Sequence, residues 1–150
     1  MFFWYKLLSY LFYPFAYFFL YLRKFKKKEH KTRYKEKLSH IKTRRGDGRL
    51  IWFHVASVGE AMSILPLVDF LKKEKEINKI LITTITLSSS QILDKRFEQD
   101  EKIIHQFLPL DVPIFVSKFL SHWRPNLAIF IDSEIWPNLI TDIKKKKIPL

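Results

Sequence analysis

The sequence predicts an α/β domain built on a parallel β-sheet, and two features support this fold class. From Leu50 onward, short apolar runs alternate with stretches of helical spacing, an order typical of βα units. The first apolar run, residues 50–56, is interrupted only by His54, as expected for a strand buried on both faces of a parallel sheet. The chain has 150 residues, the usual size of one domain with its own core.

The first strand ends in a turn that leads into a helix. Ser57 and Gly59 supply this turn, and Gly59 either takes a positive φ or lets a ligand approach the backbone closely. Glu60 begins the helical pattern, so it lies just outside the carboxyl end of a strand, where ligands bind in open parallel sheets. The helix dipole stabilises a charged carboxylate there, which makes Glu60 a candidate general base. From these residues alone, a simple helix-start acid is the more frequent explanation.

The other elements follow the same alternation. Further strands are expected at residues 79–86, 103–108 and 127–131, and the start of a fifth at 148–150. The first helix contains Pro66, which either kinks it or marks the first turn of its regular part. One of Ser88, Ser89 and Ser90 is expected to cap the next helix, which runs to Phe97.

Asp111 is expected to cap the helix after the third strand, with Pro113 in its first turn.

Two further acids form a second candidate site. Asp132 and Glu134 follow the fourth strand, and Pro137 begins another helix. Two acids two residues apart at the carboxyl end of a strand indicate such a site, because ligands bind there in open parallel sheets.

The first 22 residues differ from the rest of the chain. They contain twelve aromatic residues, and Lys6 is their only charged residue. This is the length of one membrane span, and the basic residues that follow would keep that flank in the cytoplasm. Pro14 and the aromatic content equally suit a helix lying in the membrane interface. A core helix of a soluble domain is the remaining alternative, and it would need partners on nearly all its faces.

Residues 23–49 form a basic segment with thirteen Lys and Arg and only three acids, in a chain of net charge +12. Next to a membrane anchor, such a segment is expected to attract anionic lipid head groups, although a solvated linker has the same composition. Nucleic acid is not expected as a partner, because no recognised reading motif accompanies the charge. The chain has no cysteine, and His54, His105 and His122 are not spaced as metal ligands, so no metal or cofactor site is expected.

Four blocks of sequence together point to a family. They closely resemble the N-terminal half of bacterial 3-deoxy-D-manno-octulosonic acid (Kdo) transferase, in which similar blocks occur in this order and at about these spacings. The blocks are His54-Val55-Ala56-Ser57-Val58-Gly59-Glu60, Leu108-Pro109-Leu110-Asp111, Arg124-Pro125 and Asp132-Ser133-Glu134-Ile135-Trp136-Pro137-Asn138.

The resemblance implies a GT-B glycosyltransferase with two Rossmann-like halves. The N-terminal half would take the lipid A precursor (lipid IVA), and the C-terminal half would bind the donor CMP-Kdo, without a metal or cofactor. Glu60 matches the catalytic base, and Ser57 and Gly59 belong to the substrate-binding turn beside it. Asp132 would stabilise the transition state, although it is one methylene shorter than the usual Glu, and Glu134 would support it.

The resemblance also implies a domain organisation. Residues 1–22 would be the membrane anchor, 23–49 a basic juxtamembrane linker, and 50–150 the acceptor-side Rossmann-like domain, truncated, with the donor-binding half absent. The loop after the second strand departs from the family, since Leu87-Ser88-Ser89 stands where a Thr-Gly pair is usual.

From this organisation we expect the chain to lie at the inner (cytoplasmic) membrane with its catalytic domain on the cytoplasmic face, and to transfer no sugar alone. The alternative is a non-catalytic membrane-tethered lipid-binding module, in which Glu60 only caps a helix.

Overall fold

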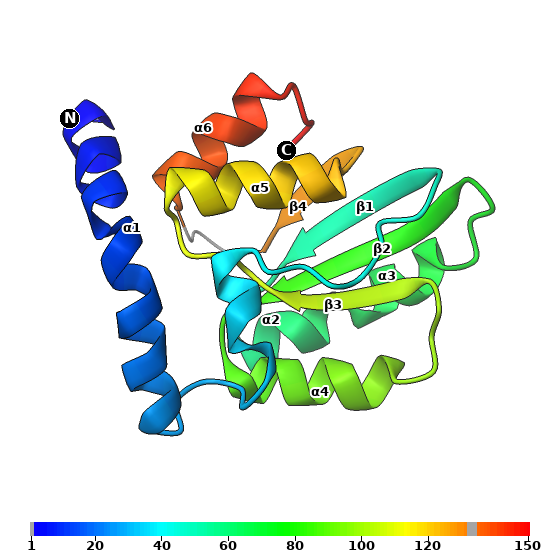
Figure 1. Cartoon of the computed structure of the whole chain (residues 1–150). Coiled ribbons are helices and arrows are strands. Elements are labelled where there is room, and N and C mark those ends of the chain that lie inside the picture. The colour runs from blue at the N-terminus through cyan, green and yellow to red at the C-terminus, as the bar shows by residue number, and fades with distance from the viewer. Residues whose placement is uncertain (1, 132–134) are drawn as a thin grey trace.

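The fold is built on one parallel sheet of four strands, in the order β3-β2-β1-β4 (Figure 1). The structure is a computed structural model that describes residues 2–131 and 135–150. The strands are β1 (Arg49–His54), β2 (Ile77–Thr84), β3 (Ile103–Phe107) and β4 (Leu127–Phe130). All three strand pairings are parallel. The α/β fold class and its parallel sheet are therefore confirmed.

Helices cover both faces of this sheet (Figure 1). One face packs against α2 (Val58–Ser63), α3 (Leu65–Leu71) and α4 (Leu87–Phe97), and the other against α5 (Pro113–Trp123) and α6 (Pro137–Lys145). Pro66 is the second residue of α3, a position where its missing N–H costs no hydrogen bond. The predicted first helix is thus two helices, and Pro66 marks the start of the second.

The residues of β1 alternate between two buried layers. Leu50 and Trp52 join the core against α5 and α6, whereas Ile51 and Phe53 join the core against α2, α3 and α4. Successive strand side chains point to opposite faces, so a strand covered on both sides must be apolar throughout. Each such side chain contributes about 1.5–3 kcal/mol when fully buried.

Thr83 is the hydrogen-bond partner of His54, the buried polar residue of β1. His54 is only 1% exposed, and its Nδ1 lies 3.0 Å from the Oγ1 of Thr83 on the neighbouring strand β2. The same hydroxyl oxygen accepts a 2.9 Å hydrogen bond from the indole N–H of Trp52. A buried polar group without a partner costs about 1–3 kcal/mol, so Thr83 makes His54 tolerable in the core.

The strand order reverses between β1 and β4. From β1 the chain proceeds outward to β2 and β3, then returns to place β4 on the other side of β1. Beyond β4, the carbonyl of Pro149 accepts a 2.9 Å hydrogen bond from the backbone N–H of Ala128. Residues 148–150 adopt no strand, so the fifth strand expected there is not formed, and this bond joins them to β4. The carboxyl ends of β1 and β4 flank a topological switch point.

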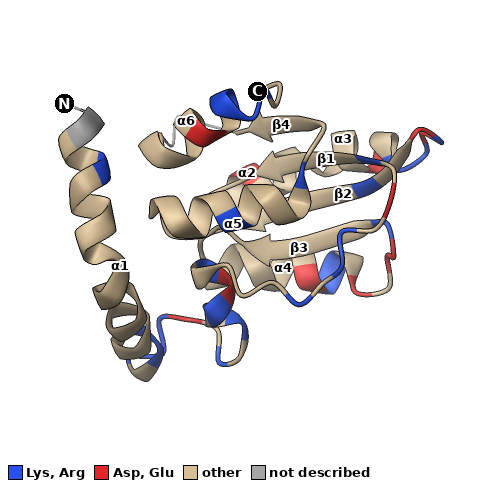
Figure 2. Cartoon of the chain, turned by 45° about the horizontal axis from the view of Figure 1, so that its top comes forward, with Lys and Arg blue, Asp and Glu red and all other residues tan. Residues whose placement is uncertain are grey.

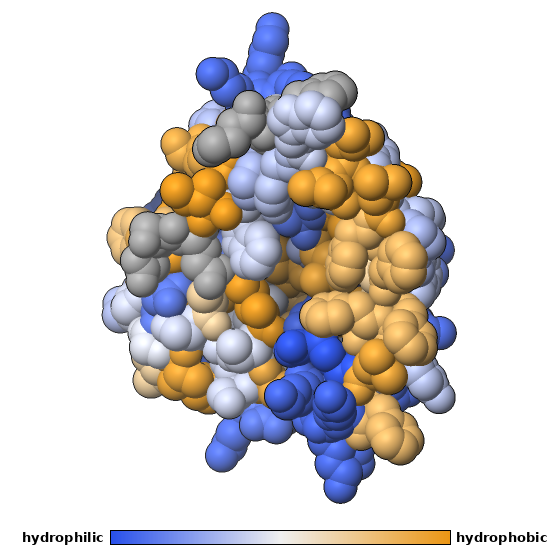
Figure 3. Space-filling view, turned by 90° about the vertical axis from the view of Figure 1, so that its left-hand side faces the viewer, coloured by the Kyte–Doolittle hydropathy of each residue, from blue (hydrophilic) through white to orange (hydrophobic). Residues whose placement is uncertain are grey.

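A long N-terminal helix, α1 (Phe2–Phe25), lies beside this domain (Figure 1). Its Ala16 and Leu20 are buried in a small core with Leu38, Val112 and Phe115. Its other face exposes many large apolar side chains, which form much of the surface in Figure 3. No helix in the described part of the chain is both long and apolar enough to span a bilayer, so the membrane-spanning form of the anchor predicted for residues 1–22 is not found.

The basic segment, residues 23–49, carries many of the Lys and Arg residues coloured blue in Figure 2, and ion pairs hold it together. Glu29 is buried, and it contacts Lys37 Nζ at 2.7 Å and Arg23 Nε at 2.6 Å. Lys37 also donates to the carbonyl of Ile85, in the loop after β2. Both ion pairs join residues of the segment itself, and removing one partner of the buried Lys37–Glu29 pair should cost about 3–5 kcal/mol. The bond from Lys37 to Ile85 joins the segment to the end of β2.

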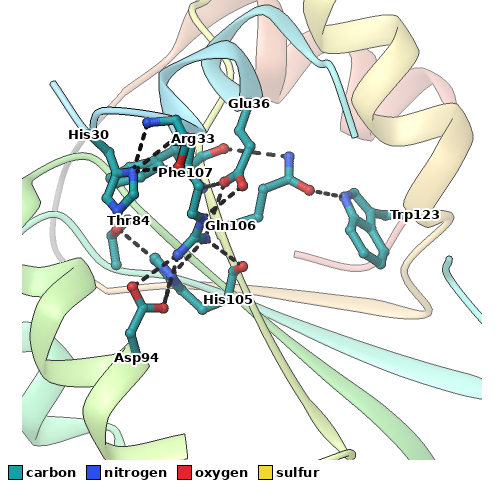
Figure 4. A network of polar contacts seen from close by, with 10 residues as sticks. His30, Arg33, Glu36, Thr84, Asp94, His105, Gln106, Phe107 and Trp123 are labelled. Carbon is teal, nitrogen blue, oxygen red and sulfur yellow. Dashed lines mark hydrogen bonds and ion pairs between the residues drawn. The ribbon is translucent and has the colours of Figure 1, made fainter. Parts of the chain in front are cut away.

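A second polar network attaches the 3₁₀ helix η1 (Arg33–Leu38) to β3 and α4 (Figure 4). The guanidinium of Arg33 donates to both carboxylate oxygens of Asp94, at 3.0 and 2.9 Å, and forms an ion pair with Glu36 at 2.8 Å. His105 lies beneath it, with Nδ1 2.9 Å from Asp94 and Nε2 2.9 Å from Thr84. Glu36 in turn accepts from the backbone N–H of Phe107.

This network predicts that the protein loses stability in acid. Burial lowers the pKa of His105, although the hydrogen bond to Asp94 acts in the opposite direction. Because the folded pKa lies below the unfolded one, protons favour the unfolded chain, and the free energy of unfolding should fall as the pH drops below about 6.5. Burial acts to raise the pKa of Asp94, but His105 and Arg33 hold it below its usual value. Asp94 should therefore add a further loss below about pH 4.

The measurement is denaturant unfolding between pH 8 and pH 4, for wild type and His105→Gln. The variant should be less stable at pH 8, because Gln does not reproduce the hydrogen bonds of His105. It should nevertheless lose less stability between pH 7 and 5, because Gln binds no proton on unfolding. A single proton taken up on unfolding changes the free energy of unfolding by at most about 1.4 kcal/mol per pH unit. Parallel pH curves for the two proteins over that range would contradict this role of His105.

Candidate active site at the end of β1

Glu60 occupies the first turn of α2, directly after β1. Ser57 is the N-cap residue of this helix, and its hydroxyl oxygen accepts from the backbone N–H of Glu60 at 3.2 Å. The hydroxyl of Ser57 also donates to Oε1 of Glu60 at 2.6 Å, and the backbone N–H of Ala56 donates to Oε2 at 2.8 Å. This reciprocal arrangement closely follows a capping box. Glu60 therefore caps α2, and its role as a base remains a prediction.

The capped carboxylate is still accessible for chemistry. Glu60 is only half buried, and Ser57, Val58 and Gly59 around it are exposed. An ionised carboxylate has about four acceptor positions, and two donors occupy only part of them. The two hydrogen bonds hold the group in one orientation at the carboxyl edge of β1, and a substrate hydroxyl can approach it from solvent.

Gly59 lies within α2 and does not take a positive φ, so the first of its two predicted roles is wrong. A Cβ at this position would meet only the Ser57 hydroxyl oxygen, at 3.9 Å, among the described atoms, which is an ordinary contact. Packing within the chain therefore does not require a glycine. Close approach of a ligand remains as the predicted role of Gly59.

Asp132 and Glu134 lie outside the described residues. The last residue described before them, Ile131, donates its backbone N–H to the carbonyl of His54 at 3.0 Å. The end of β4 is therefore joined to the end of β1, which leads into the turn at Ser57 and Glu60. In the sequence, Glu60 follows β1, whereas Asp132 and Glu134 follow β4. The sheet makes these two strands direct neighbours.

Asp111 has a different role from the one predicted. Val112, and not Asp111, is the N-cap residue of α5, and its side chain makes no capping hydrogen bond. Asp111 instead accepts from the backbone N–H groups of Asn138 and Leu139, at 3.0 and 2.9 Å, in the first turn of α6. The loop geometry turns this carboxylate away from its own helix and toward a helix that begins 26 residues later.

The same carboxylate holds α1. The hydroxyl of Tyr5 donates to Asp111 at 2.8 Å, and the amide of Asn138 donates to Ser9 Oγ and to the carbonyl of Asp111. Burial, together with the hydrogen bond and negative charge of Asp111, raises the pKa of Tyr5 to about 12. Asp111 and Asn138 were conspicuous in the sequence only as members of the resembling blocks, and their contact with α1 depends on the tertiary fold.

The three histidines named in the sequence analysis are not brought together. His54 contacts Thr83, His105 contacts Asp94 and Thr84, and Nε2 of His122 lies 2.9 Å from the carbonyl of Thr43. Within the residues that the structure describes, no group of three or more side chains is arranged to hold a metal ion.

A parallel sheet covered on both faces, with a carboxylate beside its topological switch point, defines the class: an α/β domain of Rossmann-like topology. Residues 32–150 match the family described as 3-deoxy-D-manno-octulosonic-acid transferase (kdotransferase), and the chain belongs to this family.

Curated relatives agree over nearly the whole chain. It is 36% identical over 146 residues to the probable mitochondrial 3-deoxy-D-manno-octulosonic acid transferase of Arabidopsis thaliana, covering 97% of the chain and 32% of that protein. It is 39% identical over 142 residues to the enzyme of the same name from Rickettsia bellii, covering 95% of the chain and 34% of the relative. The Haemophilus influenzae enzyme is 35% identical over 99 residues, 66% of the chain and 23% of its own length. The chain thus spans about a third of the length of the first two relatives.

Replacing Asp111 by Ala should loosen α6 and α1 together. The variant loses the cap of α6 and leaves two backbone N–H groups without their acceptor, which should lower the free energy of unfolding by about 1–3 kcal/mol. Denaturant unfolding measures this change. The exposed Asp47→Ala is the matched control and should change stability by no more than about 0.5 kcal/mol. The Tyr5 pKa should also fall, because the hydrogen bond and the negative charge of Asp111 are lost, although burial still raises it. An unchanged Tyr5 titration would show that Asp111 does not hold α1.

Proposed function

We propose that this chain forms the acceptor-side half of a GT-B glycosyltransferase that transfers Kdo from CMP-Kdo to the lipid A precursor lipid IVA. The observation that carries the proposal is the carboxylate of Glu60, held on an exposed turn at the switch point of a sheet, in a chain that belongs to the Kdo transferase family. The donor CMP-Kdo would be bound by a second half, since the relatives are about three times as long.

In the proposed step, Glu60 removes the proton from a sugar hydroxyl of the lipid acceptor. The hydroxyl oxygen then forms a bond to the anomeric carbon of Kdo while the bond from that carbon to the phosphate oxygen of CMP breaks, and CMP leaves with the electron pair. Ser57 keeps the carboxylate in position through its 2.6 Å hydrogen bond. Asp132 would stabilise the transition state and Glu134 would support it, and the chemistry uses no metal or cofactor.

The proposed location is the cytoplasmic face of the inner membrane. On α1, six large apolar side chains are each more than 60% exposed, which suits a helix lying in the membrane interface; they are Trp4, Leu8, Leu11, Phe15, Phe18 and Phe25. Residues 23–49 bring basic side chains to the end of this helix (Figure 2), and these would attract anionic lipids. Both features support an interfacial anchor that presents a lipid acceptor to the domain.

One observation favours a second candidate, a non-catalytic membrane-tethered lipid-binding module. Both oxygens of Glu60 already accept hydrogen bonds within the chain, so the residue has a structural task independent of catalysis. The two candidates differ in whether the wild-type chain transfers Kdo once a donor-binding half is supplied, and only the transferase loses that activity with Glu60.

For the transferase, Glu60→Gln should abolish activity without unfolding the domain. The chain is mixed with a separately produced donor-binding half of a relative, and transfer of Kdo from CMP-Kdo to lipid IVA is measured. Loss of a general base should lower the rate by about 10²–10⁴-fold, whereas the exposed Glu98→Gln control should keep the rate. The Ser57 cap on the backbone remains in the variant, so circular dichroism should show an intact fold. A properly folded and associated mixture that is inactive even as wild type would favour the lipid-binding module.

Gly59→Ala separates ligand approach from packing. Within a helix, Ala is more favourable than Gly by about 0.5–1 kcal/mol, and the surroundings leave room for its Cβ. The variant should therefore be slightly more stable while the mixture described above loses Kdo transfer, chiefly through a raised KM for lipid IVA. Unchanged kinetics would exclude Gly59 from the substrate-binding turn.

A further inference from the structure

A basic pocket lies between the end of α1, the segment from residue 31 to 42 and the exposed side of α5. Its volume is about 660 Å³, and five lysines line it: Lys24, Lys31, Lys35, Lys42 and Lys118. These come from three separate parts of the chain, which meet only in the folded structure. On the face shown in Figure 3, strongly hydrophilic side chains gather below the hydrophobic side chains of α1.

The positive charge of this pocket is not compensated within the described part of the protein. None of the five lysines forms an ion pair there, and Lys24 instead lies over the ring of Tyr34, 4.6 Å from its centre. The only carboxylate among the lining residues is Glu36, which is occupied by Arg33 at 2.8 Å. Gathering ammonium groups around one hollow is unfavourable unless an anion is bound.

The pKa of His40, which lines the pocket, is affected by the positive charge of these lysines. Burial lowers its pKa, and the positive charges of Lys118 and Lys35 lower it further. These two lysines belong to α5 and η1 respectively, so their charges act on one point from different elements. A bound anion at this point would oppose both of them.

An apolar groove adjoins the pocket and continues along α1. It has a volume of about 430 Å³ and shares Tyr34, Lys35 and His40 with the basic pocket. Its remaining lining residues are Tyr17, Phe18, Tyr21 and Leu38, three of which belong to the exposed aromatic face of α1. A cationic pocket that opens into an aromatic groove is complementary to a molecule with an anionic head and an apolar tail.

We propose that the basic pocket binds a phosphate ester and that the adjoining groove holds an apolar substituent of the same molecule. Each lysine ammonium has three donors, and charge-assisted hydrogen bonds to phosphate oxygens are about twice as strong as neutral ones. No residue of the turn at Glu60 is among the described residues that line the pocket or the groove, and this proposal does not depend on the transferase activity.

Isothermal titration calorimetry with the full chain tests the site. The probes are glycerol 3-phosphate, which has a phosphate and no tail, and dihexanoyl phosphatidic acid below its micelle-forming concentration. Lys35→Gln with Lys118→Gln should weaken binding of both probes by about tenfold or more. The control pair, Lys95→Gln with Lys144→Gln, removes the same charge from exposed positions outside the pocket and should change binding less than about twofold.

Two further measurements locate the ligand and identify its source. Either probe should raise the His40 pKa, followed by NMR, in wild type but not in the Lys35 and Lys118 double variant. Phe18→Ser with Tyr21→Ser should weaken only the acylated probe. Equal affinity of the wild-type chain for the two probes would overturn the role of the groove and leave a pocket for a soluble phosphate ester. Absence of binding, or an equal loss in the control pair, would overturn the proposal, and neither result bears on Kdo transfer.

Discussion

The burial of β1 on both faces is the constraint on which the rest of the structure depends. Every side chain from Leu50 to Val55 must be accommodated in a core, so helices must cover both sides and strands must flank both edges. β2 and β4 occupy those edges, which makes the end of β1 the point where the strand order reverses. This arrangement sets the position of Glu60. The chain leaves β1 at the carboxyl end of the sheet, beside the switch point, and the cap at Ser57 holds the carboxylate there.

The basic segment shows how charged sequence can be structural and functional at once. Arg23, Arg33 and Lys37 are matched by Glu29, Glu36 and Asp94 in partly or fully buried pairs, and these pairs set the path of residues 23–49 across the domain. Four of the segment's lysines that have no such partner line one hollow together with Lys118 of α5; they are Lys24, Lys31, Lys35 and Lys42. Pairing of some cations therefore positions the others, and the proposed phosphate site is a consequence of how the segment is attached.

The sequence was sufficient for the sheet and for the position of Glu60, because hydrophobic periodicity and the strand-turn-helix order are local signals. The Ser57 and Glu60 spacing even matches a capping box, although that pattern cannot decide whether the carboxylate also acts as a base. The role of Asp111 could not be predicted, since local rules assign an acid to the helix that follows it and only tertiary contact brings α6 within reach. The path of residues 23–49 escaped prediction for the same reason: composition records the charges but not their partners. Asp132 and Glu134 lie outside the described residues, so their predicted roles stay predictions.

Asp111 fixes the orientation of α1 relative to the α/β domain. One carboxylate holds the first turn of α6 and the side of α1 at Tyr5, and Asn138 ties Ser9 into the same junction. These hydrogen bonds oppose rotation of the α/β domain relative to α1. A surface that binds the exposed side of α1 therefore also sets the orientation of the sheet relative to it. That orientation in turn sets the direction from which a molecule embedded in the surface would reach Glu60.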